Sequence, residues 1–270
     1  MSGRRLALVT GASAGIGQAL ARELAARGWD LALAARRAER LEALAAELER
    51  DHGASSLILA EDLTDPAAPA RIEAAIAARG RPALALINNA GFSRTTGFSD
   101  TPWVQHQAML QVMLTAPMEL THRLAPTMKT EGFGRILNVA SVAGLLPATG
   151  GDTLYGPIKS FLIKATLGLR METEGSGVKV SALCPGYVLS EFHDVNGSRD
   201  QVSSAYPAWA WSRADEVARE GLDALEAGKP ISIPGAHNRV VADLMRLLPP
   251  SLAYAQVRRH AGRLGRVSRT

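Results

Sequence analysis

The segment LALVTGASAGIGQALARELAARG, residues 6–28, decides the fold. Its first five residues are almost all apolar, which predicts a short buried strand. The next stretch, TGASAGIG at 10–17, holds three glycines in a GxxxGxG spacing, and the remainder has helical period up to Gly28. A strand, a glycine-rich turn and a helix in this order predict the first unit of an α/β fold with a parallel sheet.

The same alternation of short apolar runs and amphipathic segments continues along the chain. Apolar runs at 6–10, 30–35, 56–60, 83–88, 135–140, 178–184 and 230–233 predict strands, and segments such as 40–50 and 71–79 have helical period. Near-continuous apolar runs such as PALALI at 82–87 indicate strands covered on both faces. We therefore expect one α/β domain over 1–270, a Rossmann-like, doubly wound parallel sheet of about seven strands with helices on both faces. A helical extension is expected at 236–270.

Composition argues against several classes of protein. The chain has 270 residues, 47% of them apolar, and a net charge of +4, which is typical of a soluble protein with a buried core. Only 5% of the residues are aromatic, too few for a basic and aromatic nucleic-acid surface. The lone Cys184 excludes an intrachain disulfide, and the six histidines have no metal-ligand spacing. We expect a cytoplasmic protein with no metal, no nucleic-acid partner and no membrane-spanning segment.

The glycine-rich turn predicts a bound dinucleotide. Glycine lets the main chain approach a pyrophosphate, and the helix that follows offers free N–H groups and the positive end of its dipole. An ordinary tight turn is the alternative, but the position of the motif between a first strand and a helix favours the cofactor site.

Two arginines follow the second strand, at the position that selects the dinucleotide. An NAD site needs a carboxylate there for the ribose 2′-hydroxyl, whereas Arg36 and Arg37 suit the 2′-phosphate of NADP. We predict NADP(H) as the cofactor, with Arg36, nearest the strand end, as the stronger candidate. Alternatively, one or both arginines only face solvent at the start of the next helix.

A tyrosine and a lysine stand four residues apart in LYGPIKSFLIKATLGL, residues 154–169. Tyr155 and Lys159 therefore share one face of a predicted helix. Pro157 lies between them and is tolerated only in a first turn, which places the pair at the start of that helix. By itself, the spacing also fits an ordinary amphipathic helix whose lysine reaches solvent.

Six motifs in a fixed order make the chain resemble the short-chain dehydrogenases/reductases. They are TGxxxGIG at 10–17, Asp62-Leu63, NNAG at 88–91, Ser141, the Tyr155/Lys159 pair and Pro185-Gly186, and the resemblance covers residues 4–192. It implies a Rossmann fold, a nicotinamide cofactor and the catalytic residues Ser141, Tyr155 and Lys159. The residues that it assigns to cofactor binding, beside the two arginines, are Gly11, Ser13, Gly15, Ile16, Gly17, Asp62, Leu63, Asn89, Ala90, Gly91, Tyr155, Lys159, Pro185, Gly186, Val188 and Ser190.

The chemistry of the catalytic side chains agrees with this resemblance. Reduction of a carbonyl group needs a hydride from the nicotinamide and a proton for the oxygen, which Tyr155 can donate. We expect the ammonium group of Lys159 to lower the pKa of the phenol, and the family implies that this group also hydrogen-bonds the nicotinamide ribose. Ser141, after the fifth strand, can donate to the substrate oxygen or only cap a turn.

One position departs from the family pattern. The helix HQAMLQVMLTAPMEL, residues 106–120, should carry an asparagine that helps to hold a relay water near the lysine, and Met113 takes its place. A methionine cannot donate an amide hydrogen bond. Either main-chain carbonyl groups hold the water instead, or the relay is impaired.

The segment around 190–212 is irregular and aromatic, and in the family this region closes over the substrate. We expect Tyr187, Phe192 and Tyr206 to face the pocket, and we predict NADPH-dependent reduction of hydrophobic or bulky ketones to secondary alcohols. A 3-oxoacyl thioester reductase and a catalytically silent NADP-binding protein are the alternatives. The family usually forms homodimers or homotetramers, and the apolar helical patterns at 239–248 and 252–260 are expected to pack on their own domain or on a second subunit, with a membrane surface as the minor alternative.

Overall fold

The computed structural model describes residues 3–94, 96–149, 152–189 and 210–263. Its strands are β1 (Leu6–Thr10), β2 (Asp30–Ala35), β3 (Ser56–Ala60), β4 (Ala83–Asn88), β5 (Gly134–Val139), β6 (Val178–Leu183), β7 (Tyr187–Leu189), β8 (Trp211–Arg213) and β9 (Ile231–Ser232). Its α-helices are α1 (Gly15–Ala26), α2 (Ala38–His52), α3 (Ala68–Ala77), α4 (Trp103–Leu110), α5 (Ala116–Thr130), α6 (Tyr155–Glu172), α9 (Ala214–Glu226), α10 (Ala236–Leu247) and α11 (Pro250–Arg263). A π-helical turn, η1 (Gln111–Thr115), joins α4 to α5, and a 3-10 turn, η2 (Val142–Leu145), follows β5.

The main sheet is parallel and has the strand order β3-β2-β1-β4-β5-β6-β9. From β1 the chain builds outward through β2 to β3, and it then crosses back to place β4 on the other side of β1. This reversal is the topological switch point of the sheet. Doubly wound sheets bind their ligands there, beyond the carboxyl ends of the strands.

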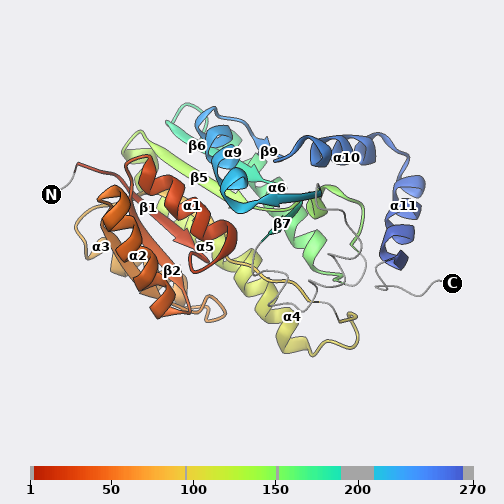
Figure 1. Ribbon diagram of the computed structural model, residues 1–270, viewed down its shortest axis with the longest axis horizontal. Helices are drawn as coiled ribbons and strands as arrows, with labels where there is room; N and C mark the ends of the chain where they lie inside the picture. The colour runs from red at the N-terminus through yellow and green to blue at the C-terminus, as the bar shows by residue number, and fades with distance from the viewer. Residues whose placement is uncertain (1–2, 95, 150–151, 190–209, 264–270) are drawn as a thin grey trace.

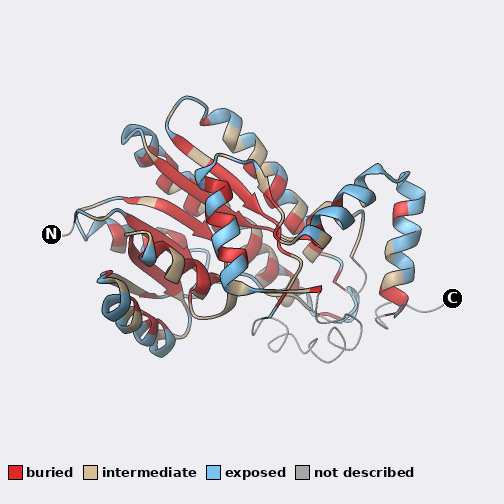
Figure 2. Ribbon diagram, turned by 45° about the horizontal axis from the view of Figure 1, so that its top comes forward, coloured by how far each residue is buried: buried red, intermediate tan, exposed pale blue. Residues whose placement is uncertain are grey.

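Helices cover both faces of the sheet because its central strands are apolar on both sides (Figures 1 and 2). In β1, Val9 packs into a hydrophobic cluster with Leu20 of α1 and Leu222 of α9. Its neighbour Leu8 points to the opposite face and packs into a second cluster with Leu120 of α5. Because successive strand residues alternate between faces, each central strand supplies both clusters.

The predicted fold class and strand pattern are confirmed. The runs at 6–10, 30–35, 56–60 and 83–88 coincide with β1 to β4, whereas β5 begins and ends one residue earlier than predicted, and β6 and β9 are shorter. The sequence did not predict a small second sheet, in which β7 pairs in parallel with β8. Strands of three residues are too short to show a hydrophobic period.

The predicted C-terminal extension contains two helices, α10 and α11. They lie beyond β9, to one side of the main sheet (Figure 1). No helix within the described ranges is both long and apolar enough to span a membrane.

Candidate active site

The glycine turn after β1 has the shape of a phosphate cradle. Gly11 and Gly15 have φ angles of 65° and 57°, in the left-handed region that favours glycine. Gly17 is required for a different reason, because a Cβ atom there would lie 2.3 Å from the carbonyl oxygen of Gly11. The residue before α1 is Ala14, whose side chain makes no capping hydrogen bond to the first-turn N–H groups. Those N–H groups can therefore bind a phosphate.

A hydrogen-bonded clamp joins the ends of β1 and β4 beside this turn. Thr10 Oγ1 accepts the N–H groups of Asn89 and Ala90 at 3.0 and 3.1 Å and donates to the carbonyl oxygen of Ile87 at 3.2 Å. Asn89 Nδ2 donates in turn to the carbonyl oxygens of Thr10 and Gly11, at 3.0 and 3.2 Å. The clamp brings two predicted cofactor-binding segments together. Sequence reasoning missed Thr10, whose only signal is a hydroxyl at the end of an apolar strand.

Of the two arginines after β2, Arg37 contacts the glycine turn. Its Nη2 donates to Ser13 Oγ at 3.0 Å, whereas the side chain of Arg36 is exposed. Ser13 and Arg37 therefore meet where the 2′-phosphate of NADP is held in doubly wound folds. Ile16, in the same turn, packs against the first hydrophobic cluster, so its side chain stabilises the turn.

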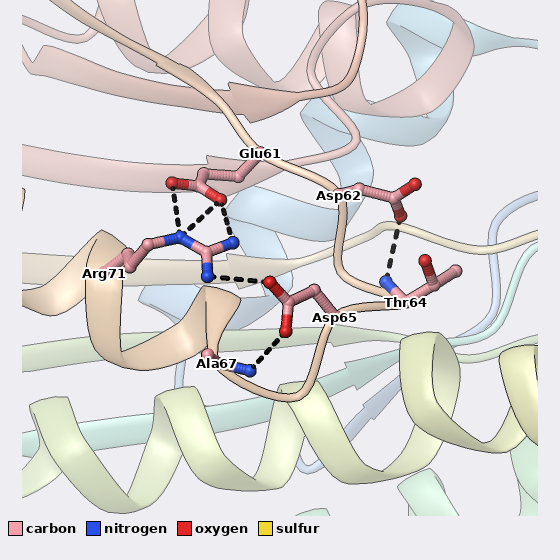
Figure 3. A network of polar contacts seen from close by, with 6 residues as sticks. All are labelled: Glu61, Asp62, Thr64, Asp65, Ala67 and Arg71. Atoms are coloured by element: carbon pink, nitrogen blue, oxygen red, sulfur yellow. Dashed lines mark hydrogen bonds and ion pairs between the residues drawn. The ribbon is translucent and has the colours of Figure 1, made fainter.

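The loop after β3 is braced by Arg71 (Figure 3). Its guanidinium group contacts Glu61 Oε2 at 2.6 Å and Asp65 Oδ2 at 2.7 Å. Asp65 Oδ1 also accepts the N–H of Ala67 at 2.9 Å, and this bond, together with Arg71, lowers the pKa of Asp65. The ion pairs are exposed, so they orient the loop more than they stabilise the fold.

Asp62 and Leu63, the predicted cofactor contacts of this loop, have different surroundings. Asp62 is exposed, and its Oδ1 accepts the N–H of Thr64 at 2.9 Å in a tight turn. Leu63 is buried in the second hydrophobic cluster. Asp62 can therefore offer a polar side chain to a ligand, whereas the side chain of Leu63 anchors the loop.

Ser141, Tyr155 and Lys159 come together at the carboxyl end of β5. Ser141 caps η2, and its side chain forms a hydrogen bond with Tyr155, the first residue of α6. Lys159 follows one helical turn later, with its Nζ 5.6 Å from the centre of the Tyr155 ring. Because α6 begins at Tyr155, Pro157 falls in the first turn, as its lack of an N–H group requires.

Val139, the last residue of β5, completes this group. Lys159 is only 4% exposed, and its Nζ donates to the carbonyl oxygen of Val139 at 2.8 Å. The alternative in which the lysine reaches solvent is therefore wrong. Burial lowers the pKa of Lys159 to about 8. Sequence reasoning missed Val139, because a main-chain acceptor leaves no trace in the residue type.

Burial also dominates the pKa of Tyr155. It raises the pKa above the ordinary value of a phenol, the hydrogen bond with Ser141 opposes this, and the charge of Asp152 adds to it. Our expectation that Lys159 lowers this pKa is therefore wrong: the pKa is raised, and Lys159 is not among the groups that shift it. The phenol keeps its proton at neutral pH, as a general acid must. The thiol of Cys184 is neutral as well, because burial raises its pKa to about 12, which agrees with a buried residue rather than a nucleophile.

Met113 lies beside Lys159, where the sequence aligns it with the family asparagine. It is fully buried in η1. A Cβ atom on Gly91 would lie 3.0 Å from Met113 Sδ and 3.7 Å from Lys159 Nζ, so these groups converge. Gln111 begins the same turn, and its Nε2 is buried with no hydrogen-bond partner among the described residues. The methionine sulfur thus fills the space beside the lysine, and the π-helical geometry of the turn is typical of functional sites.

The loop at 185–186 borders the site on its other side. The carbonyl oxygen of Pro185 accepts the N–H of Val142 at 2.9 Å and the hydroxyl of Ser141 at 3.5 Å. A Cβ atom on Gly186 would lie 2.3 Å from Asn238 Oδ1, so only glycine fits between this loop and α10. Of the two predicted cofactor-binding residues of the loop, Pro185 therefore lies next to Ser141, and Gly186 packs against the first turn of α10.

Part of the predicted site lies outside the described residues, namely the cofactor contact Ser190, the pocket residues Phe192 and Tyr206, and the rest of the substrate-covering segment up to residue 209. Of the others, Val188 is buried in β7, and Tyr187 packs against Trp211 of β8 with ring centres 5.6 Å apart. The short second sheet thus places two aromatic rings after the loop at 185–186.

Asp152 is a further residue of the site that the sequence did not indicate. Its carbonyl oxygen accepts the N–H of Tyr155 at 3.3 Å, and its carboxylate Oδ2 accepts the N–H of Arg94 at 2.9 Å. Asp152 is 9% exposed, and its charge raises the pKa of Tyr155. A carboxylate therefore lies near Tyr155, and a hydrogen bond joins it to Arg94 in the segment that follows Gly91. Across the described ranges, no group of three or more His, Cys, Asp or Glu side chains is placed to hold a metal ion.

Comparison with known proteins agrees with this geometry. A model of the family described as short chain dehydrogenase matches residues 5–200. The chain is 38% identical over 217 residues to serine 3-dehydrogenase of Agrobacterium fabrum, which covers 78% of this chain and 84% of the relative.

Two solved structures share the fold over nearly the whole chain. One is a short-chain dehydrogenase from Sphingobium yanoikuyae in complex with NADPH, 31% identical, with a TM-score of 0.79 over 91% of this chain and 96% of that one. The other is a bulky-bulky ketone specific alcohol dehydrogenase from Comamonas testosteroni, 26% identical, with a TM-score of 0.74 over 91% and 95% of the two chains. NADPH, the cofactor predicted from the sequence, is thus the one that the first of these structures holds. From the family match and the shared fold, the chain belongs to the short-chain dehydrogenase family, whose members are oxidoreductases.

Proposed function

We propose that the protein is an NADPH-dependent reductase of ketones that also works in reverse as an alcohol dehydrogenase. The observation that carries this proposal is the half-buried phenol of Tyr155, which a raised pKa keeps protonated and which is hydrogen-bonded to Ser141 at the carboxyl end of the sheet. It stands next to the switch point, where a dinucleotide binds in this fold.

The residues present fit NADP(H). The cradle at Gly17 is too narrow for a Cβ atom, and the first turn of α1 has no side-chain cap from Ala14, so both suit a pyrophosphate. Arg37 and Ser13 supply a positive charge and a hydroxyl for the 2′-phosphate. No carboxylate follows β2 directly, where an NAD site would need one.

When NADPH is bound, its nicotinamide would supply the hydride for the carbonyl carbon. Tyr155 donates its proton to the carbonyl oxygen, and Ser141 donates a hydrogen bond to that oxygen as its charge develops. Lys159, held by Val139, keeps a positive charge close to the phenol below about pH 8. This charge favours the phenolate that remains after proton transfer.

The proposed substrate class is hydrophobic or bulky ketones. Tyr187 and Trp211 support this, because two packed rings beside the loop at 185–186 offer an apolar wall. The Comamonas neighbour is also named for bulky ketones.

The decisive experiment is to follow NADPH oxidation with a panel of bulky aromatic ketones, small ketones and acetoacetyl thioesters. We expect turnover with bulky ketones to exceed that with thioesters at least tenfold. A preference for thioesters would instead favour a 3-oxoacyl thioester reductase. Bound NADPH without turnover over the whole panel would favour a catalytically silent binding protein.

A second candidate is the oxidation of a polar β-hydroxy amino acid, and Asp152 is the observation that favours it. A buried carboxylate next to Tyr155 can bind an ammonium group close to the reacting hydroxyl. The relative from Agrobacterium fabrum is named for serine. Reduction of NADP⁺ by L-serine tests this candidate. Asp152→Asn should lower that rate at least tenfold and leave the reduction of ketones within about twofold.

A further inference from the structure

Helix α10 begins with a turn that faces the loop at 185–186. Gly235 precedes the helix with a φ angle of 82°, and Asn238, in the first turn, is 8% exposed. The Nδ2 of Asn238 donates to the carbonyl oxygen of Pro234 at 2.8 Å, so the side chain folds back on the turn. The amide cannot be reversed, because its oxygen would then face a carbonyl oxygen. A buried side chain is thus held in one orientation.

This amide packs against Gly186. The three atoms nearest to a Cβ atom on Gly186 would all belong to Asn238, with Oδ1 at 2.3 Å, Nδ2 at 2.6 Å and Cγ at 2.7 Å. Protein interiors are close-packed, so a side chain in such close contact with main chain limits where that main chain can lie. Asn238 therefore prevents the loop at 185–186 from moving toward α10.

The carbonyl oxygen of Pro185, next in the chain, sets the position of Ser141. It accepts the N–H of Val142, the first residue of η2, at 2.9 Å and lies 3.5 Å from Ser141 Oγ. The second distance is at the limit of a hydrogen bond, so this carbonyl group is a weak acceptor for the hydroxyl. The hydroxyl remains available to Tyr155, with which it also forms a hydrogen bond, and to a substrate oxygen. A shift of the loop would change that balance.

The turn η2 contacts both α10 and α6. In the contact with α6, a Cβ atom on Gly144 would lie 2.6 Å from the main-chain carbonyl carbon of Lys159, so the turn lies directly on the helix that begins with Tyr155. The distance between Ser141 and the phenol therefore depends on where η2 lies. Helix α10 acts on this turn by direct contact and through the loop at 185–186.

The hydrogen bond to Pro234, by itself, fits an asparagine that only stabilises a turn. That role needs the amide N–H and the carbonyl group of Pro234, and it is indifferent to the residue at position 186. The contact with Gly186 goes beyond it, because it connects the amide of Asn238 to the loop that holds η2.

We propose that Asn238 is a positioning residue for Ser141. Its amide holds Gly186, and through the carbonyl group of Pro185 it keeps the hydroxyl of Ser141 directed at the oxygen that Tyr155 protonates. The inference rests on the proposed function, in which Ser141 donates a hydrogen bond to the substrate oxygen. It gives the first turn of the C-terminal extension a part in catalysis.

A kinetic double-mutant cycle tests this role. Asn238→Ala should lower kcat for ketone reduction by about five- to twentyfold and change the KM for NADPH by less than about threefold, because the glycine cradle lies elsewhere. In a Ser141→Ala background the same change should lower kcat by less than about twofold, since the group that it positions is already absent. Asp243→Ala, at an exposed position of α10, is the control and should keep the wild-type kcat. An equal loss in both backgrounds, or no loss in either, would overturn the proposal.

Hydrogen exchange of the free chain, followed by NMR, tests the same link without catalysis. The amide of Val142 donates to Pro185 and should exchange faster in Asn238→Ala than in the wild type or in Asp243→Ala. This increase should exceed any change at Leu33, a fully buried residue of β2 that reports global unfolding, by at least about tenfold. Unchanged exchange at Val142 would overturn the proposal. A wild type that shows this pattern but does not reduce ketones would refute the proposed function and leave the link between Asn238 and the loop in place.

Gly186→Ala tests the contact from the side of the loop, and it decides the question if Asn238→Ala does not fold. Its methyl carbon would lie 2.3 Å from Asn238 Oδ1, so the loop or α10 must move. Exchange at Val142 should then increase by the same margin of at least about tenfold over the change at Leu33. An amide of Val142 that keeps its wild-type protection in Gly186→Ala would refute the link.

Discussion

The Nζ of Lys159 lies 2.8 Å from the carbonyl oxygen of Val139 and donates a hydrogen bond to it. This bond ties the first turns of α6 to the end of β5, two residues before Ser141. The distance between Ser141 and Tyr155 is therefore set by a helix and a strand, and the loop between them can vary in length.

Replacement of Tyr155 by phenylalanine should abolish most of the catalysis. The variant loses the proton donor and keeps the ring, so we expect turnover to fall by about 10²–10⁴-fold with the affinity for NADPH almost unchanged. Tyr254→Phe, at an exposed position of α11, is the matched control and should keep full turnover. Steady-state rates and NADPH fluorescence measure the two effects. Equal turnover in both variants would refute the assignment of Tyr155.

Lys159 should make stability depend on pH. Its pKa is about 8 in the folded chain and about 10.5 when exposed, so between these values the unfolded chain binds more protons and the free energy of unfolding rises with pH. Below pH 8 the folded chain buries a charged amine, which lowers the free energy of unfolding by about 3 kcal/mol.

Lys159→Met removes that cost. The stability of the variant relative to wild type should therefore be greatest near pH 7 and decline by about 2–3 kcal/mol toward pH 10.5. Urea unfolding across this range measures the trend. Lys164→Met, at an exposed position of the same helix, should show no such trend. A constant difference for Lys159→Met would mean that its pKa is not lowered.

Cofactor choice should depend on the arginines after β2. Arg37→Asp places a carboxylate next to Ser13, and we expect the ratio of kcat/KM for NADPH over NADH to fall by about 10–100-fold. Arg36→Asp should shift the ratio in the same direction, by less if Arg37 is the main contact. Arg79→Asp, at an exposed position after α3, controls for net charge. An unchanged ratio in both variants would show that neither arginine binds the 2′-phosphate.

A methyl group at Gly17 should disrupt the cofactor cradle. Its carbon would lie 2.3 Å from the carbonyl oxygen of Gly11, so Gly17→Ala must displace the turn, with a loss of about 1–3 kcal/mol in stability and at least tenfold in NADPH affinity. Gly168→Ala is the control, because nothing lies within 4 Å of a Cβ there and the site is helical. That change should stabilise the fold by up to about 1 kcal/mol. Thermal unfolding and NADPH titration separate the two outcomes.

Met113→Asn should change turnover only modestly and should alter its pH dependence. An amide at this position can hold a water near Lys159, and main-chain carbonyl groups already offer partners for one. The buried amide should also cost about 1–3 kcal/mol in stability, whereas Met113→Leu should cost less than about 1.5. A wild type without activity that Met113→Asn converts into a robust ketone reductase would contradict this account and favour the silent binding protein.

The substrate pocket was the least predictable part of the site. The sequence indicated the aromatic residues of the substrate-covering segment from composition alone. The carboxylate of Asp152, in contrast, is held by the N–H group of Arg94, 58 positions away. A charged residue in a polar loop has no local signature that separates a buried neighbour of Tyr155 from an ordinary solvent-exposed side chain.

The sequence by itself determined the fold class, four of the strands to the residue, the glycine cradle and the pairing of Tyr155 with Lys159. These features are local, since hydrophobic period, glycine spacing and helical register act over a few neighbouring residues. Only the tertiary structure decided that Arg37 meets Ser13, that Val139 holds Lys159 and that Met113 packs beside Gly91. Each of these depends on how distant segments are brought together in space, and a short stretch of sequence contains no information about the segment that will lie against it.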